Sequence, residues 1–366
     1  MKRKLIFTTL FFLITLYVPF SLFSQDFVIN GTLLVRYRGN AANVTIPKNV
    51  TAIEEDAFYN NTKLTSVIIP DSVISIGSRA FAECKSLTSI TIPESVTAIG
   101  GSAFSDCTRL TSVTIPESVT YIGVAAFKGC VSLTSITIPT NVTFFGSYAF
   151  YDCTSLKSAT IPENVTSIGD GIFSNCTSLK NVTIPAGVTS IGRHAFSNCT
   201  SFTSVTIPAG VTSIGDWAFS RCSRLTSVTI PSSVTSIGVC VFLNCTDLTS
   251  VTIPSSVTSI GDSAFNSCTS LKSVTIPSSV TSISEGAFIG CTSLTSLTIQ
   301  EGVISIGNSA FSDCTKLTSV TIPSSVTSIG DFAFSRCINL RTVVLSRKTT
   351  IGRNAFLANS QITYSD

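Results

Sequence analysis

The sequence has little charge and few of the side chains that perform chemistry. Only 12% of its 366 residues are Asp, Glu, Lys or Arg, and it contains one histidine, one tryptophan and one methionine. The net charge of +3 comes from Lys2, Arg3 and Lys4, because without them the basic residues equal the 20 acidic ones in number. A near-neutral chain has no basic field to hold nucleic acid or anionic lipid. We therefore expect neither as a partner.

Catalytic combinations are also scarce. The single histidine, His194, lies in "IGRHAF" with no nucleophile motif beside it. A Ser-His-Asp set needs a buried imidazole held between two partners, so we interpret His194 as a solvated turn residue. No combination of acid, base and nucleophile recurs or converges. The sequence predicts no enzyme, no catalytic residue, no metal site and no cofactor.

The N-terminus has the order of a secretory signal peptide, predicted over residues 1–24. A basic triplet precedes an apolar run, and small residues follow near Ser24. An uncleaved anchor is the alternative, because the run is nearly long enough to span a bilayer. Pro19 breaks the run and favours cleavage. Since no later apolar segment of the sequence has membrane length, we expect a secreted or cell-surface protein without a membrane span after cleavage.

What the sequence does contain is one unit repeated along nearly its whole length. Phenylalanine recurs every 23 residues from Phe58 to Phe334 and returns at Phe356 after 22. A typical copy, residues 248–270, is "LTSVTIPSSVTSIGDSAFNSCTS". Self-similarity at a fixed period of this size indicates a solenoid. Forty-four per cent of the residues are hydrophobic, as a long continuous core requires.

Each copy predicts a short strand followed by turns. Alternating apolar residues in "VTIP" favour a strand with one buried face, and Gly261 suits a turn with positive φ. The stretch "DSAFNSC" is interpreted as one helical or 3₁₀ turn that buries Ala264, Phe265 and Cys268. We predict an α/β repeat solenoid, an arc or rod of about 14 rungs, with a parallel β-sheet face and short helical or 3₁₀ turns. At strand spacing it would be on the order of 65 Å long.

The unit L-x-x-V-x-I-P-x-x-V-x-x-I-G-x-x-A-F-x-x-C resembles the leucine-rich repeats of the Treponema pallidum type, also called BspA-like repeats. The resemblance covers residues 43–359, the predicted solenoid. It implies a secreted or surface protein, since several family members act as adhesins that bind host proteins such as fibronectin and fibrinogen. Fold alone does not fix function.

The predicted solenoid is flanked by two short segments. Residues 25–42 carry two apolar runs around Asn30 and Gly31, a hairpin signal that predicts an N-terminal β-hairpin cap. Residues 360–366 form a C-terminal tail with no comparable cap signal. Either Ile362 and Tyr364 cover the last rung, or that end associates with another surface.

Twelve cysteines occupy one column of the repeat, three residues after the phenylalanine. Stacked side chains point the same way, whereas a disulfide needs converging Cβ atoms, and a ladder offers no tetrahedral zinc cluster. We interpret the column as buried thiols, with disulfides as the open alternative. Asn61 and Asn359 replace cysteine in the end copies, which packing with weak hydrogen bonds explains. Cys240 lies outside the column and is interpreted as a semi-exposed turn residue, or alternatively as a reactive or intermolecular thiol.

Aromatic residues interrupt the polar turn positions of a few copies. Since Trp and Tyr are enriched at binding hot spots, they are candidate partner-binding residues, with folding over their own rung as the alternative. The candidates are Tyr121, Phe144, Tyr148, Tyr151, Trp217 and Phe332.

The sequence thus favours a protein-binding leucine-rich-repeat scaffold, adhesin-like, whose partners are host or extracellular-matrix glycoproteins. The alternative is a structural cell-envelope or matrix protein that self-associates through its C-terminal end. Ice binding by the regular Ser-x-Thr strand face is a third hypothesis.

Overall fold

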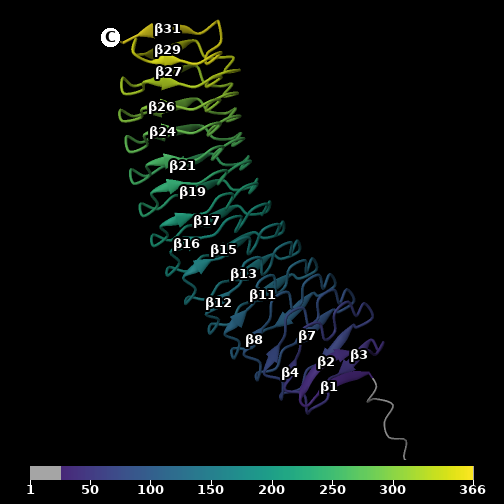
Figure 1. Cartoon of the computed structure of the whole chain (residues 1–366). Coiled ribbons are helices and arrows are strands. Elements are labelled where there is room, and N and C mark those ends of the chain that lie inside the picture. Colours follow the sequence, from purple (N-terminus) through teal and green to yellow (C-terminus); the bar gives the residue numbers. More distant parts are fainter. Residues whose placement is uncertain (1–25, 366) are drawn as a thin grey trace, which may run out of the picture.

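The protein is a β-solenoid whose rungs stack into a long, bent rod (Figure 1). The computed structural model describes residues 26–365, so the predicted signal peptide lies outside the described residues. The copies form about 14 turns linked by parallel strand pairs, which confirms the predicted repeat solenoid.

The first strand of each copy forms one side of the rod. Its middle residue points inward and its outer residues are mostly Ser and Thr, and the copies pair in parallel with matching columns, as Ser227 pairs with Ser250. These strands are β3 (Asn43–Thr45), β5 (Ser66–Ile68), β7 (Ser89–Thr91), β9 (Ser112–Thr114), β11 (Ser135–Thr137), β13 (Ser158–Thr160), β15 (Asn181–Thr183), β17 (Ser204–Thr206), β19 (Ser227–Thr229), β21 (Ser250–Thr252), β23 (Ser273–Ile276), β25 (Ser296–Ile299), β27 (Ser319–Thr321) and β29 (Thr342–Leu345). In the C-terminal tail, β31 (Gln361–Tyr364) extends the same side.

A second parallel strand follows in each copy, where the sequence predicted only a turn. The "SI" pairs before the glycine hydrogen-bond from rung to rung and line a second side. These strands are β4 (Ala52–Ile53), β6 (Ser75–Ile76), β8 (Ala98–Ile99), β10 (Tyr121–Ile122), β12 (Phe144–Phe145), β14 (Ser167–Ile168), β16 (Ser190–Ile191), β18 (Ser213–Ile214), β20 (Ser236–Ile237), β22 (Ser259–Ile260), β24 (Ser282–Ile283), β26 (Ser305–Ile306), β28 (Ser328–Ile329) and β30 (Thr350–Ile351).

The glycine after this strand has a different role from the predicted one. Gly261 does not have positive φ; instead, a Cβ there would lie 2.7 Å from the backbone carbonyl carbon of Gly238 in the rung before. At Gly100 the corresponding distance, to the carbonyl carbon of Gly77, is 2.6 Å. Glycine dominates this column because in most rungs the neighbouring backbone approaches too closely for a side chain. Glu54 and Ser284 are the exceptions.

The third side is a run of tight turns, so the predicted helical or 3₁₀ turn is wrong. The described residues contain no helix. Arg79 and Glu83 have φ of 54° and 58°, and residues with positive φ cannot continue a right-handed helix. Alternate N–H groups also leave the local pattern: Ala82 donates to Arg79 three residues back, whereas Phe81 donates to Ala103 in the next rung. Hydrogen bonds between stacked rungs therefore use N–H groups that a 3₁₀ turn would use within its own segment.

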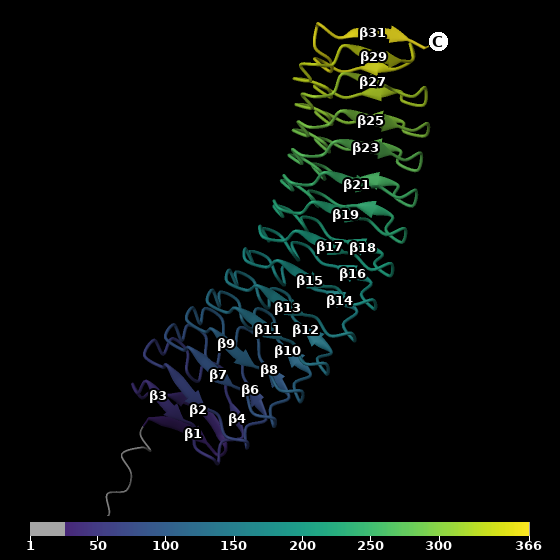
Figure 2. The same cartoon turned by 180° about the vertical axis from the view of Figure 1, so that it is seen from behind.

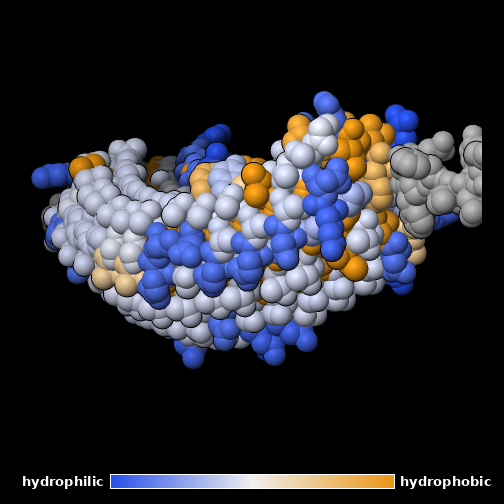
Figure 3. Space-filling view, turned by 90° about the horizontal axis from the view of Figure 1, so that it is seen from below, coloured by the Kyte–Doolittle hydropathy of each residue, from blue (hydrophilic) through white to orange (hydrophobic). Residues whose placement is uncertain are grey.

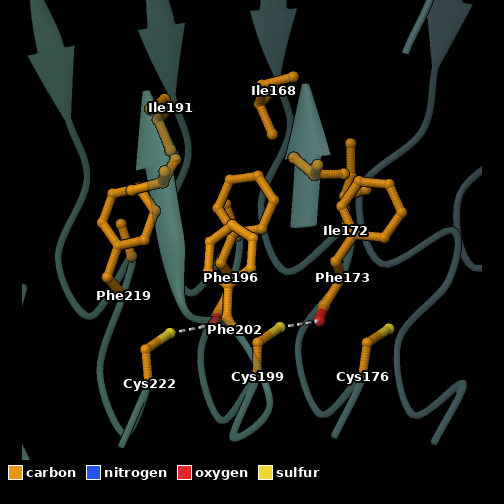
Figure 4. Close-up of a cluster of buried hydrophobic side chains, with 14 of the residues drawn as sticks. Ile168, Ile172, Phe173, Cys176, Ile191, Phe196, Cys199, Phe202, Phe219 and Cys222 are labelled. Carbon is orange, nitrogen blue, oxygen red and sulfur yellow. Dashed lines mark hydrogen bonds between the residues drawn. The ribbon is translucent and has the colours of Figure 1, made fainter. Parts of the chain in front are cut away.

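A stack of phenylalanine rings fills the interior. From Phe58 to Phe356 successive rings lie 4.8 to 5.8 Å apart between centroids and are nearly parallel, and part of the stack is drawn in Figure 4. Rung spacing sets this distance, because each ring packs on its equivalent one copy away. The burial predicted for the phenylalanine column is confirmed for every ring from Phe58 to Phe334, each at most 1% exposed.

Beside the rings runs the column of buried cysteines. All are free thiols, and each Sγ donates to the carbonyl oxygen of the phenylalanine 26 residues earlier, as Cys199 does to Phe173 at 3.1 Å (Figure 4). In the first copy Asn61 donates in the same way, through Nδ2, to the oxygen of Gly39 at 3.5 Å. The prediction of packed thiols with weak hydrogen bonds is confirmed.

Each end of the rod extends a different sheet. The N-terminal hairpin, β1 (Phe27–Asn30) and β2 (Leu33–Tyr37), adds to the second sheet through β4. The Tyr37 ring packs against the Phe58 ring with centroids 5.1 Å apart and 32° between the planes. At the other end β31 pairs with β29 in the first sheet, and Ile362 packs against the core. The tail therefore covers the last rung, the first of the two predicted alternatives.

The rod bends between β11 and β17 in both views, and the even-numbered strands lie along the outer side of the bend (Figures 1 and 2). There the second sheet is interrupted: β12 ends one hydrogen-bonded sheet, and β14 begins the next. A two-residue strand contributes few ladder bonds, so stretching the outer side opens this junction easily. This interruption between β12 and β14, which we call the seam, lies next to the copies that contain candidate aromatic residues.

Candidate partner-binding surface

Four of the six candidate aromatics gather at the bend. Tyr121 and Phe144 lie on β10 and β12, and Tyr148 and Tyr151 lie in the turn run that follows β12. We name these four residues the aromatic surface. Trp217 and Phe332 belong to rungs further along the rod, so the structure does not bring all six together.

Tyr121 and Phe144 form a stacked pair on the outer face of the second sheet. Their ring centroids are 4.8 Å apart with 7° between the planes, and the side chains are 41% and 46% exposed. A hollow of about 270 Å³ opens beside Phe144 over the seam between β12 and β14, with Ser147 and Gly169 in its lining. The pair buries one face of each ring and leaves the others to solvent.

Tyr148 and Tyr151 form the second half of the surface. Their rings meet at 68° with centroids 6.0 Å apart, which makes a corner of two walls. Together with Ala125 and Lys128 they line a hollow of about 380 Å³. Because Val124 lines the first hollow and Ala125 the second, the two hollows are neighbours on the surface.

A glycine in the next rung fixes the position of Tyr148. A Cβ at Gly171 would lie 2.3 Å from Cε1 of the Tyr148 ring. The ring therefore lies over the following rung and is still 40% exposed. The ring thus lies over the next rung rather than over its own, and the role of Tyr148 in partner binding stays a prediction.

The backbone at this position disfavours large side chains. Tyr148, Trp217 and Phe332 share one column and have φ of 59°, 62° and 61°. Other copies place Ser102 or Asn354 in the same left-handed conformation. Left-handed backbone costs L-residues roughly 1–2 kcal/mol and suits Gly and Asn best. The fold requires the conformation in every rung, but it does not require the aromatic ring.

Trp217 pairs with the only histidine. The His194 ring stacks on the Trp217 ring with centroids 5.7 Å apart and 20° between the planes. Burial, together with the nearby positive charge of Arg193, lowers the pKa of His194. His194 lies in a turn, as predicted, but it is only partly solvated, because the Trp217 indole covers one face of its ring.

Phe332 lies apart near the C-terminal end. It is 41% exposed and borders a hollow of about 580 Å³ with Phe356 and Leu357. Its environment is that of the last rungs, and nothing places it with the aromatic surface.

Cys240 is not the semi-exposed residue that the sequence predicted. It is 6% exposed, and burial raises the pKa of its thiol. A raised pKa leaves little thiolate at neutral pH, which disfavours a reactive or intermolecular role. Within residues 26–365 no group of three or more His, Cys, Asp and Glu is placed to hold a metal ion.

Sequence reasoning missed two features near the N-terminus and one at the bend. Exposed Ile68 and Ile74 replace the threonines of other copies, and apolar colour gathers near that end in Figure 3. Tyr59 carries an ionic cluster described below. Lys128 stands in the column of Tyr151, one rung earlier, and comparison of these columns could have found it.

Comparison with known families gives a match over nearly the whole described chain. The family described as "BspA type Leucine rich repeat region (6 copies)" matches residues 36–157, 145–272 and 237–363. No curated protein shows a significant match. Within residues 26–365, no helix has the length and apolar character needed to cross a membrane.

Solved structures of bacterial repeat proteins are similar to the chain. A leucine-rich repeat protein from Bacteroides ovatus is 31% identical, with 93% of this chain and 100% of that chain covered and a TM-score of 0.81. A leucine rich cell surface protein from Faecalibacterium prausnitzii is 36% identical over 87% and 92%, with a TM-score of 0.57. A leucine-rich repeat protein from Eubacterium ventriosum is 28% identical over 90% and 89%, with a TM-score of 0.58.

Proposed function

The chain belongs to the BspA-type leucine-rich repeat family, and from this membership we propose that it is a secreted or cell-surface scaffold that binds proteins in an adhesin-like manner. The partners are host or extracellular-matrix glycoproteins. A similar protein is described as a cell surface protein, and the signal-peptide pattern of residues 1–24 agrees with export.

The aromatic surface carries this proposal. Tyr121, Phe144 and Tyr148 are exposed and Tyr151 is half-buried. All four lie on a rigid stack of rungs, so a partner can contact them without ordering a loop first. A few residues carry most of the binding energy at protein interfaces, and Trp and Tyr are enriched among them. The Ser and Thr ladders of the first sheet offer only small polar groups. The two hollows beside the rings give a partner concave places to fill.

Surface plasmon resonance against immobilised extracellular-matrix glycoproteins, including fibronectin and fibrinogen, tests the proposal. We expect the purified protein to bind at least one of them, and the double variant Tyr148→Ser/Tyr151→Ser to lose roughly 2 kcal/mol or more, about thirtyfold in Kd. Tyr59→Ser is the matched control, because Tyr59 occupies the column of Tyr151 and is 39% exposed. Binding that the double variant leaves unchanged would reject the aromatic surface as the contact.

One observation favours the structural alternative. β31 is the terminal strand of its sheet, with Tyr364 47% exposed, and an open strand edge is a template for pairing with another chain. Light scattering between low and high micromolar concentration should then show growing assemblies. A constant monomer mass over this range would dismiss the alternative.

A further inference from the structure

We propose that the hollow lined by Lys128, Tyr148 and Tyr151 binds one acidic sugar residue, a pyranose ring that carries a carboxylate, on the glycan of the partner. This inference rests on the proposed function, because it assigns a ligand class to part of the same aromatic surface.

The size and shape of the hollow suit a single sugar ring. Its volume of about 380 Å³ is near the lower end of the range of roughly 300–1,000 Å³ for small-molecule sites. The Tyr148 and Tyr151 rings form two walls at 68°. A pyranose presents C–H bonds on one face, which pack on the electron-rich face of an aromatic ring, while its hydroxyl groups point outward.

The positive charge of Lys128 favours an anionic ligand in the hollow. The Lys128 Nζ lies 5.7 Å from the centroid of the Tyr151 ring, and no ion pair with a carboxylate within residues 26–365 involves it. An exposed ammonium without a carboxylate can form a charge-assisted hydrogen bond with a ligand. The same charge repels a quaternary ammonium group, the other ligand that aromatic corners bind.

The Tyr151 hydroxyl supplies a hydrogen-bond donor at the edge of the hollow. Asn175 Nδ2 donates to the Tyr151 Oη at 3.2 Å, and Asn198 Nδ2 donates to the Asn175 Oδ1 at 3.0 Å. Since the Tyr151 oxygen accepts this bond, its own O–H is available to donate to a sugar hydroxyl or carboxylate. The hollow thus combines an apolar wall, a cation and a hydroxyl donor.

The first experiment compares acidic and neutral sugars on the purified protein by saturation-transfer NMR and calorimetry. The probes are methyl β-D-glucuronide, as in matrix polysaccharides, and the α-methyl glycoside of N-acetylneuraminic acid, as in glycoprotein glycans. Methyl β-D-glucoside is the neutral control. We expect a Kd on the order of 1 mM for at least one acidic probe and binding about tenfold weaker for the glucoside; whichever acidic probe binds identifies the source. Equal binding of the three, or binding of none, would overturn the proposal.

Variants distinguish the effect of the Lys128 charge from a general effect on the folded protein. Lys128→Met should weaken acidic-probe binding about tenfold, whereas Lys128→Arg should retain it. Lys272→Met removes an exposed lysine that directly precedes β23, several rungs away, and should change nothing. Tyr148→Ser should abolish binding of all probes. Unaltered affinity in Lys128→Met would reject the role of the ammonium.

Enzymatic removal of the partner's glycans distinguishes this inference from the proposed function. If a deglycosylated matrix protein still binds and still depends on Tyr148, the scaffold function stands and the sugar site is wrong. If the acidic probes bind but no matrix protein does, the sugar site stands and the adhesin-like function is wrong.

Discussion

Tyr59 and Tyr151 occupy the same column of the repeat four rungs apart, but their side chains make different contacts. The Tyr59 hydroxyl donates to Glu83 Oε1 at 2.8 Å, and the Arg79 guanidinium carbon lies 4.5 Å from its ring centroid. Beside Tyr151 the same two columns hold Gly171 and Asn175, and Asn175 Nδ2 donates to the Tyr151 hydroxyl oxygen at 3.2 Å. The cation near this ring is Lys128 of the preceding rung, 5.7 Å from the centroid. The Tyr59 hydroxyl donates its proton to a carboxylate of the chain, whereas the Tyr151 hydroxyl only accepts a bond and its ring borders an open hollow. Exposure alone therefore does not indicate a binding residue.

The largest expected effect on this comparison comes from high pH, because the two rungs differ in the cysteine column. Tyr59 is followed by Asn61, and Tyr151 by Cys153 between Cys130 and Cys176. Burial raises the pKa of the column thiols, well above the usual value of 9.0 at Cys130 and Cys176. Since unfolded thiols ionise near pH 9 and folded ones do not, stability is complete below pH 9 and is lost as pH rises further.

The loss amounts to roughly 1.4 kcal/mol per thiol for each pH unit above 9. Because solenoid rungs unfold locally, the central rungs should lose structure before the first rung, which has Asn61. Circular dichroism from pH 8 to 11 in reductant measures the loss of structure, and hydrogen–deuterium exchange followed by mass spectrometry compares the first rung with the central rungs. Recovery after return to pH 8 is the control. An unchanged spectrum at pH 11 would contradict the role of the thiols.

A smaller effect is expected from Gly171→Ala, which alters only the central region. The new methyl group meets the Tyr148 ring and the left-handed backbone, so we expect a loss of about 1–2 kcal/mol of stability and weaker partner binding as the ring shifts. Urea denaturation and plasmon resonance measure the two effects. Arg79→Ala is the matched control, since that position has the same conformation and a side chain already. It should cost no more than about 1 kcal/mol, from its exposed ionic contacts.

The smallest effect concerns the ionisation of Tyr59. The hydrogen bond to Glu83 and the charge of that carboxylate raise the pKa of the Tyr59 phenol above its usual value near 10. The raised pKa means that this bond stabilises the protein at neutral pH and is lost as pH rises through the phenol pKa. Carbon-13 NMR of the tyrosine ring should show the pKa fall in Glu83→Gln. A pKa that Glu83→Gln leaves unaltered would contradict the assigned bond.

Much of the fold follows from the column pattern, and less of the site does. The stacked rings from Phe58 to Phe334 and the buried thiols could be predicted, because each copy buries the same columns. The glycine column could not, since Gly261 is required by the backbone of Gly238 rather than by its own φ. The aromatic residues were visible in the sequence, but their separation into one surface and two isolated positions was not.

The sequence by itself determined the period, the residues that each rung buries and the family, because every copy repeats the same pattern of buried and exposed positions. Only the tertiary structure decided what each exposed residue meets. Stacking makes neighbours of residues about 23 apart, so it brings Lys128 to Tyr151 and lets Gly171 make room for Tyr148. Stacking also redirects N–H groups between rungs, which replaces the expected helical turn with tight turns, and opens the seam at the bend.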